Sequence, residues 1–130
     1  MAEADDRNRA RMYLEKAEAF LLAAQNEEDN RLWIPAAGMA IHAGISAKDA
    51  IATALTGRTA KSDDHRQAVR ELEKILAGHP EQARACRALG ELIAEKSTVE
   101  YTHRRVGASK VQVLVRRAET LVDLARTVVN

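Results

Sequence analysis

A set of polar side chains within the alanine-rich stretch 34–57 has the types and the spacing of a binding site. Its members, which we call the polar seam, are His42, Ser46, Asp49, Thr53 and Thr56. A helix turns by about 100° per residue, so all of them would fall within about 40° of one direction. Imidazole, carboxylate and hydroxyl groups in such a row can hold a small ligand. They can equally satisfy one another in a buried network that fixes the register of the helices.

The ligand-binding alternative predicts a cleft beside the stretch 34–57. We expect groups from the polar seam to form its floor and groups from later in the chain to form its rim. The predicted cleft residues are His42, Ser46, Asp49, Lys96 and Tyr101, with His65 at the edge. A nucleotide or another small phosphorylated molecule would suit such a cleft.

Arg58 and His65 have the chemistry of RNA cleavage. A histidine can accept and donate a proton near neutral pH, and a guanidinium group can stabilise the negative charge that develops on phosphorus. These two residues are therefore chemically suited to act together at a phosphate group. The alternative is a solvated loop arginine and a histidine in the first turn of a helix.

A basic cluster with Arg104 and Arg105 at its centre could contact phosphates, with support from Lys110, Arg116 and Arg117. An ordinary charged surface is the alternative, because no interleaved aromatic residues offer base stacking. The four histidines share no ligand-like spacing, so we expect no metal site, and we expect no cofactor because no phosphate-binding glycine loop is present. The single cysteine, Cys86, falls on an apolar stripe and is predicted to be an inert core residue.

Composition indicates one all-α domain spanning residues 1–130. The chain is 46% hydrophobic and 30% charged, with two prolines and six glycines. Its formal net charge of +1 does not favour a dedicated DNA-binding domain, whose affinity comes largely from neutralising phosphates. No apolar run is long enough to cross a membrane, and the charged N-terminal residues do not resemble a signal peptide. We therefore expect a soluble, cytoplasmic protein.

The hydrophobic periodicity predicts five helices with short connections, typical of an antiparallel, up-and-down bundle. They are expected at 5–25, from about 32–34 to Gly57, from Ser62 to Gly78, from His79 and Pro80 to about Lys96, and from Ser109 onward. The polar segment 26–30 is predicted to be a turn that ends with a helix cap at Asn30, and 97–108 a loop. Ser109 and Gln112 have the spacing of a capping box.

Four stretches together resemble the HEPN superfamily (higher eukaryotes and prokaryotes nucleotide-binding), specifically its small stand-alone bacterial members. They are YLEKAEAFLLAA from Tyr13, PAAGMAIHAGISAKDAIATALTGR in the central stretch, DHRQA from Asp64 and KSTVEY from Lys96 to Tyr101. The resemblance covers nearly the whole chain.

The resemblance implies an up-and-down helical bundle, a homodimer, and a role with RNA or nucleotides in toxin–antitoxin, stress or defence systems. Catalytic members use an arginine followed by a histidine, usually with a polar residue such as asparagine next to the arginine. The resemblance makes Arg58 and His65 the candidate catalytic pair of a metal-independent endoribonuclease. The pair departs from the family pattern, because Thr59 follows Arg58 and the segment TAKSDD separates it from His65. Other members bind nucleotides or partner proteins such as an antitoxin or a nucleotidyltransferase. We expect this chain to be such a binding module, with the endoribonuclease and a purely structural interaction module as alternatives.

Overall fold

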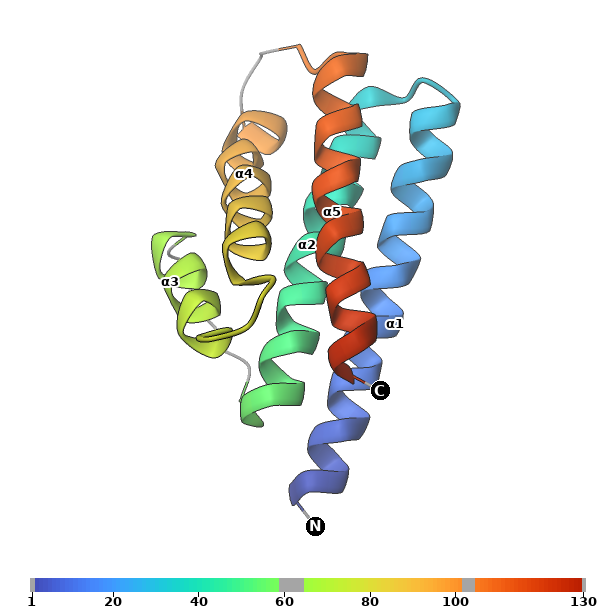
Figure 1. Cartoon of the computed structure of the whole chain (residues 1–130). Helices are drawn as coiled ribbons and strands as arrows, with labels where there is room; N and C mark the ends of the chain where they lie inside the picture. The colour runs from blue at the N-terminus through green and yellow to red at the C-terminus, as the bar shows by residue number, and fades with distance from the viewer. Residues whose placement is uncertain (1, 59–64, 102–104, 130) are drawn as a thin grey trace.

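A computed structural model of the chain describes residues 2–58, 65–101 and 105–129, and these form five helices and no strand (Figure 1). The helices are α1 Ala2–Asp29, α2 Trp33–Thr56, α3 His65–Ile75, α4 Gln82–Tyr101 and α5 Ala108–Val129. The predicted all-α class is confirmed. No helix in the described ranges combines the length and the apolar character needed to cross a bilayer.

Helix α2 lies at the centre and packs against each of the other four helices. In Figure 1 α1 lies on one side of it, α5 in front, and α4 with α3 on the other side. Its alanines make close approach possible, because their short side chains let the neighbouring helices come near its backbone. The fully buried ones are Ala36, Ala37, Ala40, Ala43, Ala47 and Ala50.

Gly44 is the point of closest packing on α2. A Cβ atom at this position would lie 2.4 Å from Leu92 Cδ1 of α4 and 3.4 Å from Leu121 Cδ1 of α5. Both leucines are buried, so neither has free space into which it could move. Glycine here allows three helices to meet.

The boundaries of α2 confirm the prediction. Pro35 lies in its first turn, where no amide donor is needed, and Gly57 ends it with a left-handed φ of 72°. The Gly57 carbonyl also accepts a 2.8 Å hydrogen bond from Arg9 Nη2, which ties the end of α2 to α1. The predicted cap at Asn30 is wrong, because Leu32 occupies the cap position and the Asn30 amide donates to Asn26 O instead.

Other boundaries also differ from prediction, including the end of α3 at Ile75 and the start of α4 at Gln82. Helix α1 continues to Asp29, so most of the predicted turn 26–30 is helical, and the chain reverses at Arg31, whose φ is 60°. Helix α4 continues to Tyr101, so 97–101 is not a loop; Val99 packs against the core there, and this packing outweighs the low helix propensity of a β-branched residue. Helix α5 begins at Ala108, which places Ser109 inside its first turn and not at the cap. The predicted start at Ser62 lies outside the described residues.

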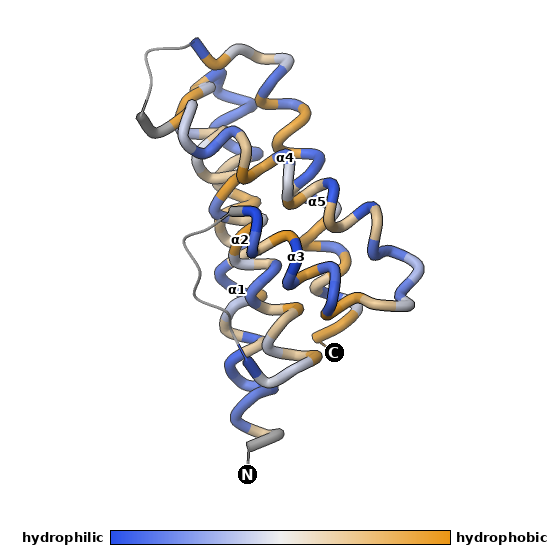
Figure 2. Tube along the Cα trace, turned by 90° about the vertical axis from the view of Figure 1, so that its left-hand side faces the viewer, coloured by the Kyte–Doolittle hydropathy of each residue, from blue (hydrophilic) through white to orange (hydrophobic). Residues whose placement is uncertain are grey.

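The core consists of the apolar faces of all five helices. In Figure 1 α1 and α4 run upward while α2 and α5 run downward. Figure 2 shows hydrophobic and hydrophilic positions alternating along each helix, the pattern of amphipathic helices that bury one face. The apolar residues that recur at three- and four-residue spacing form a stripe along α5, and all of them are buried except Val128, which is partly exposed. They are Val111, Leu114, Val115, Ala118, Leu121, Val122, Ala125, Val128 and Val129. This packing leaves the outer faces of α1, α4 and α5 to carry the polar groups.

Candidate functional site

The polar seam of α2 lies along the contact with α1. His42 packs its ring against Phe20 of α1, with centroids 5.3 Å apart and planes inclined by 32°. Ser46 is buried and Thr53 is fully buried, so neither presents its hydroxyl group to solvent. Thr56 donates from Oγ1 to Ala52 O at 2.7 Å, a bond within its own helix. Most of the polar seam is therefore engaged inside the fold.

Asp49 of the polar seam forms an ion pair that sequence reasoning missed. Its Oδ1 lies 2.8 Å from Lys48 Nζ, and the two side chains are only 18% and 10% exposed. Burial raises the pKa of the Asp49 carboxyl, and this effect exceeds the opposing influence of Lys48 and of Lys16 on α1. The clue in the sequence was a lysine in the middle of an otherwise apolar helix.

The two residues predicted to form the rim of the cleft, Lys96 and Tyr101, both lie on α4. The cations that act on Asp49 are Lys48 and Lys16, whereas Lys96 is a partly buried residue of α4 and is not among them. Tyr101 ends α4, but its side chain lies outside the described part of the structure. The grouping of Lys96 and Tyr101 with the polar seam in one cleft stays a prediction.

Arg58 and His65 flank the connection between α2 and α3. Arg58 is exposed directly after Gly57, and its backbone N–H donates to Thr56 Oγ1 at 3.1 Å. Helix α3 begins at His65, whose side chain lies outside the described part of the chain. The catalytic pairing of these two residues stays a prediction.

The basic cluster predicted near Arg105 is spread out. Arg104 lies outside the described residues, and Arg105 is exposed just before α5. Lys110 pairs with Glu95 of α4, with 2.9 Å between Nζ and Oε1. Arg116 and Arg117, about two turns beyond Lys110 on α5, lie instead beside a hollow in the surface.

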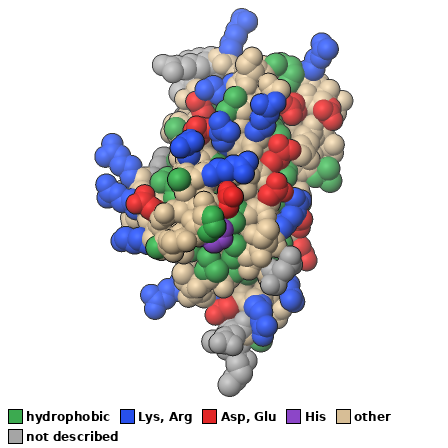
Figure 3. Space-filling model, viewed as in Figure 1, with side chains coloured by type: hydrophobic (Ala, Val, Ile, Leu, Met, Phe, Trp, Pro, Cys, Tyr) green, Lys and Arg blue, Asp and Glu red, His purple; other side chains and the backbone are tan. Residues whose placement is uncertain are grey.

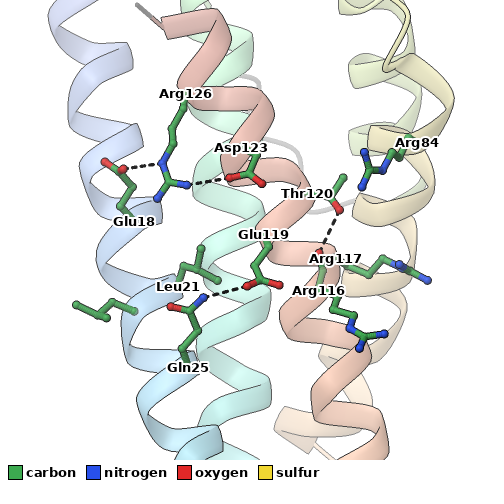
Figure 4. A pocket seen from close by; sticks show the side chains of 11 residues that line it. Glu18, Leu21, Gln25, Arg84, Arg116, Arg117, Glu119, Thr120, Asp123 and Arg126 are labelled. Atoms are coloured by element: carbon green, nitrogen blue, oxygen red, sulfur yellow. Dashed lines mark hydrogen bonds and ion pairs between the residues drawn. The ribbon is translucent and has the colours of Figure 1, made fainter.

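That hollow has a volume of about 680 Å³ and lies where α1, α4 and α5 meet (Figure 4). We call it the arginine groove. It is lined by Glu18, Leu21, Leu22, Gln25, Arg84, Arg116, Arg117, Glu119, Thr120, Asp123 and Arg126. In Figure 4 Arg84, Arg116 and Arg117 lie toward α4, whereas Arg126 lies toward α1 with Glu18, Gln25 and Glu119.

A second hollow of about 450 Å³ continues the arginine groove between α4 and α5. The two share Arg84, Arg117 and Thr120, and the second adds Arg87. Figure 3 shows Lys and Arg side chains gathered on the upper half of this face, bordered on the right by acidic side chains. Guanidinium groups from two helices thus face one continuous surface.

The acidic side of the arginine groove is held by hydrogen bonds between helices. Arg126 Nε donates to Glu18 Oε2 at 2.9 Å, and Arg126 Nη1 donates to Asp123 Oδ1 at 2.8 Å. Gln25 Nε2 donates to Glu119 Oε2 at 3.0 Å. The bonds to Glu18 and from Gln25 link α5 to α1, and the bond to Asp123 lies within α5.

The basic side has looser partners. Arg84 is 70% exposed, and its Nη1 lies 3.8 Å from Glu81 Oε2, near the limit for an ion pair. Arg116 is exposed and acts through space on Glu28, whose pKa is raised by burial and partly lowered again by this arginine. Arg117 bonds to Glu91 through Nε, leaving its two terminal nitrogens as further donors. These groups are available to an anion.

Sequence reasoning named Arg116 and Arg117 but missed Arg84 and Arg87. Their shared feature is position on exposed faces of two neighbouring helices, which a single sequence does not reveal. No group of three or more histidine, cysteine or acidic residues within the described ranges is arranged to hold a metal ion. No family model matches the chain, and no curated protein matches it as a relative.

Proposed function

We propose that this chain is a HEPN-like, antiparallel five-helix module that binds a phosphate-bearing ligand, a nucleotide or RNA, in the arginine groove. The observation that carries the proposal is that Arg84 of α4 and Arg116 and Arg117 of α5 line one hollow. The all-helical class and the four sequence stretches that resemble HEPN proteins support the fold assignment.

Arginine suits this role because its planar fork of donors matches the oxygens of a phosphate group. A volume of about 680 Å³ falls within the range of roughly 300–1,000 Å³ typical of small-molecule sites. The carboxylates across the groove can accept hydrogen bonds from ribose hydroxyls or base amino groups. One end would therefore hold phosphate and the other a sugar or base.

Binding of nucleotides and a short single-stranded RNA to the purified chain tests the proposal. We expect Arg84→Ala with Arg116→Ala to weaken binding at least tenfold, because each removes a cation that faces the ligand. Arg7→Ala with Arg11→Ala is the matched control, since both are exposed arginines of α1 outside the groove. Equal binding by the two double variants, or no binding by the unmodified chain, would overturn the proposal.

The salt dependence of binding separates the two ligand classes. RNA that lies along the groove releases counterions, so the logarithm of affinity falls with the logarithm of salt concentration by about 0.7 for each phosphate neutralised. A mononucleotide would give a slope near that of one to three contacts. A longer RNA that binds with a steeper slope than a nucleotide would identify RNA as the ligand.

The proposal includes a homodimer and a protein partner such as an antitoxin or a nucleotidyltransferase, by likeness to HEPN proteins. Light scattering on the purified chain tests the dimer.

An endoribonuclease is the second candidate, favoured by the exposed Arg58 beside the contact of α2 with α3. RNA cleavage that resists a chelator and is lost in both Arg58→Ala and His65→Ala would support it. A chain that binds neither nucleotide nor RNA would instead favour the structural interaction module.

A further inference from the structure

A shallow, mostly apolar groove of about 430 Å³ lies between α3 and α4. Its lining, which defines the α3–α4 groove, is Arg66, Val69, Arg70, Gly90, Ile93 and Ala94. Figure 1 places α3 on the opposite side of α4 from α5, so this groove is separate from the arginine groove. Among the described helices α3 packs only against α4 and α2, which leaves its outer face uncovered.

Gly90 at the floor of the groove is not required by packing within the chain. A Cβ atom there would meet only Val69 Cγ2, at 3.9 Å, an ordinary contact. Glycine in the middle of a helix costs roughly 0.5–1 kcal/mol relative to alanine. Gly44, in contrast, is enforced by Leu92. The absence of a side chain at Gly90 therefore leaves the groove open without improving the packing of this chain. It also allows the backbone of another helix to approach α4 closely.

The rim of the α3–α4 groove is basic. Arg66 and Arg70 line the groove, and the exposed Lys74 continues their four-residue spacing along α3 beyond that lining. Glu73 is their exposed acidic neighbour, and it acts on Cys86 of α4. An apolar floor beside a row of cations complements a helix with one apolar face and acidic residues at the same spacing.

We propose that the α3–α4 groove docks an acidic amphipathic helix of a partner protein. Small or medium apolar side chains of that helix would pack on Val69, Ile93 and Ala94, with its backbone closest to α4 at Gly90. Its carboxylates would face Arg70 and Lys74. Helix α3 has 11 residues and is about 16 Å long, so the contact spans two to three turns.

A pair of labelled peptides tests this docking site. The first is an 18-residue helical peptide with alanine and leucine on one face and glutamate at four-residue intervals beside it; the second has lysine in place of each glutamate. In fluorescence anisotropy with the full chain, the acidic peptide should bind at least tenfold more tightly. Arg70→Glu with Lys74→Glu should reverse that preference, whereas Arg11→Glu on α1 should leave it unchanged.

The Gly90→Leu variant, with Gly38→Leu as its matched control, tests whether the peptide binds in the α3–α4 groove. Both glycines lie inside helices, and an added Cβ meets nothing within 4 Å at Gly38 and only Val69 at Gly90. Neither variant should lower the melting temperature, but only Gly90→Leu should weaken peptide binding at least tenfold. Unchanged binding in Gly90→Leu, or no binding by the unmodified chain, would overturn the proposal.

Two further outcomes would also overturn it. If Arg84→Ala with Arg116→Ala abolishes peptide binding, the peptide occupies the arginine groove instead. If the chain is a dimer that Gly90→Leu separates into monomers, the occupant is a second copy of the chain and not a partner helix. Nucleotide binding serves as the independent readout, because Gly90→Leu should not change it.

Discussion

The polar seam of α2 and the arginine groove contain similar polar groups in different surroundings. In the polar seam His42 packs on Phe20, Thr53 is fully buried, and Asp49 pairs with Lys48. In the arginine groove Arg84 and Arg116 face solvent beside a hollow. Most of the first set is enclosed by the fold, and the arginines of the second are open to solvent.

The difference follows from where each helix lies. Helix α2 packs against all four other helices, so polar groups on it must find partners within the fold or incur a desolvation cost of about 1–3 kcal/mol each. Helices α4 and α5 each keep one face in solvent, where an arginine needs no partner. Residue type and spacing identify groups capable of chemistry, but the covering helices decide which of them a ligand can reach.

The largest effect is expected at the centre of α2. Gly44→Ala should lower stability by about 1–3 kcal/mol, because its Cβ would overlap Leu92 and overpack the core. Gly38→Ala, on the same helix with open space around it, should raise stability by up to about 1 kcal/mol through helix propensity. Thermal unfolding followed by circular dichroism measures both. Equal shifts in the two variants would mean that α2 is not tightly packed at Gly44.

The next effect separates the two regions directly. Arg84→Ala with Arg116→Ala should reduce nucleotide or RNA affinity by about 1.4 kcal/mol or more, equivalent to tenfold, with little change in melting temperature. Asp49→Asn should change the melting temperature and leave affinity intact. Measuring binding and unfolding on the same preparations tests this. Loss of nucleotide or RNA binding in Asp49→Asn would show that the ligand binds at the polar seam, and it would contradict the distinction drawn between the two regions.

The helices could be predicted because hydrophobic periodicity records which face each one buries. The stripe of α5 and both ends of α2 agree with prediction, and Gly57 was identifiable because few other residues adopt its left-handed conformation. Positions 97–101 were predicted wrongly because Thr98 and Val99 have low helix propensity, and packing of Val99 on the core outweighs it.

The candidate site could be predicted only in part. The polar seam could be recognised as a row of polar groups, but the sequence shows one helix at a time and cannot show that Phe20 of α1 lies against His42. Arg84 and Arg117 are far apart in sequence, so their common hollow becomes visible only when α4 and α5 are packed together. Hydrophobic periodicity predicts which face of a helix is buried, but it does not predict which helix packs next to it. Sites assembled from several helices therefore cannot be predicted from periodicity alone.

A smaller effect concerns the pH dependence of stability at Asp49. Burial raises the pKa of this carboxyl in the folded chain above its ordinary value of 3.8, so the folded state binds the proton more tightly than the unfolded state. The contribution of the carboxyl to stability is therefore present below pH 3.8 and is lost as pH rises through the folded-state pKa. As pH increases through that pKa, the melting temperature of the unmodified chain should fall relative to that of Asp49→Asn.

Melting curves of both proteins at a series of pH values from acid to neutral measure this difference. Glu15→Gln on the exposed face of α1 is a suitable control, and its melting temperature should track that of the unmodified chain. A difference that grows in favour of the unmodified chain as pH rises would show that Lys48 and Lys16 outweigh burial. The ion pair between Asp49 and Lys48 would then make a net stabilising contribution to the fold.

The smallest effect is expected at Cys86, where burial and a neighbouring charge act together. Burial raises the pKa of the thiol, and Glu73 adds to the rise, so little thiolate is present near neutral pH. Alkylation by iodoacetamide should therefore be slower than for an unstructured cysteine peptide. Glu73→Gln should speed the reaction slightly and Glu15→Gln should not. If Glu73→Gln has no effect while the denatured chain reacts as fast as the peptide, burial alone protects Cys86. Packing would then shield the Cys86 thiol of α4 from reagents in solution, as it shields most of the polar seam of α2 from solvent.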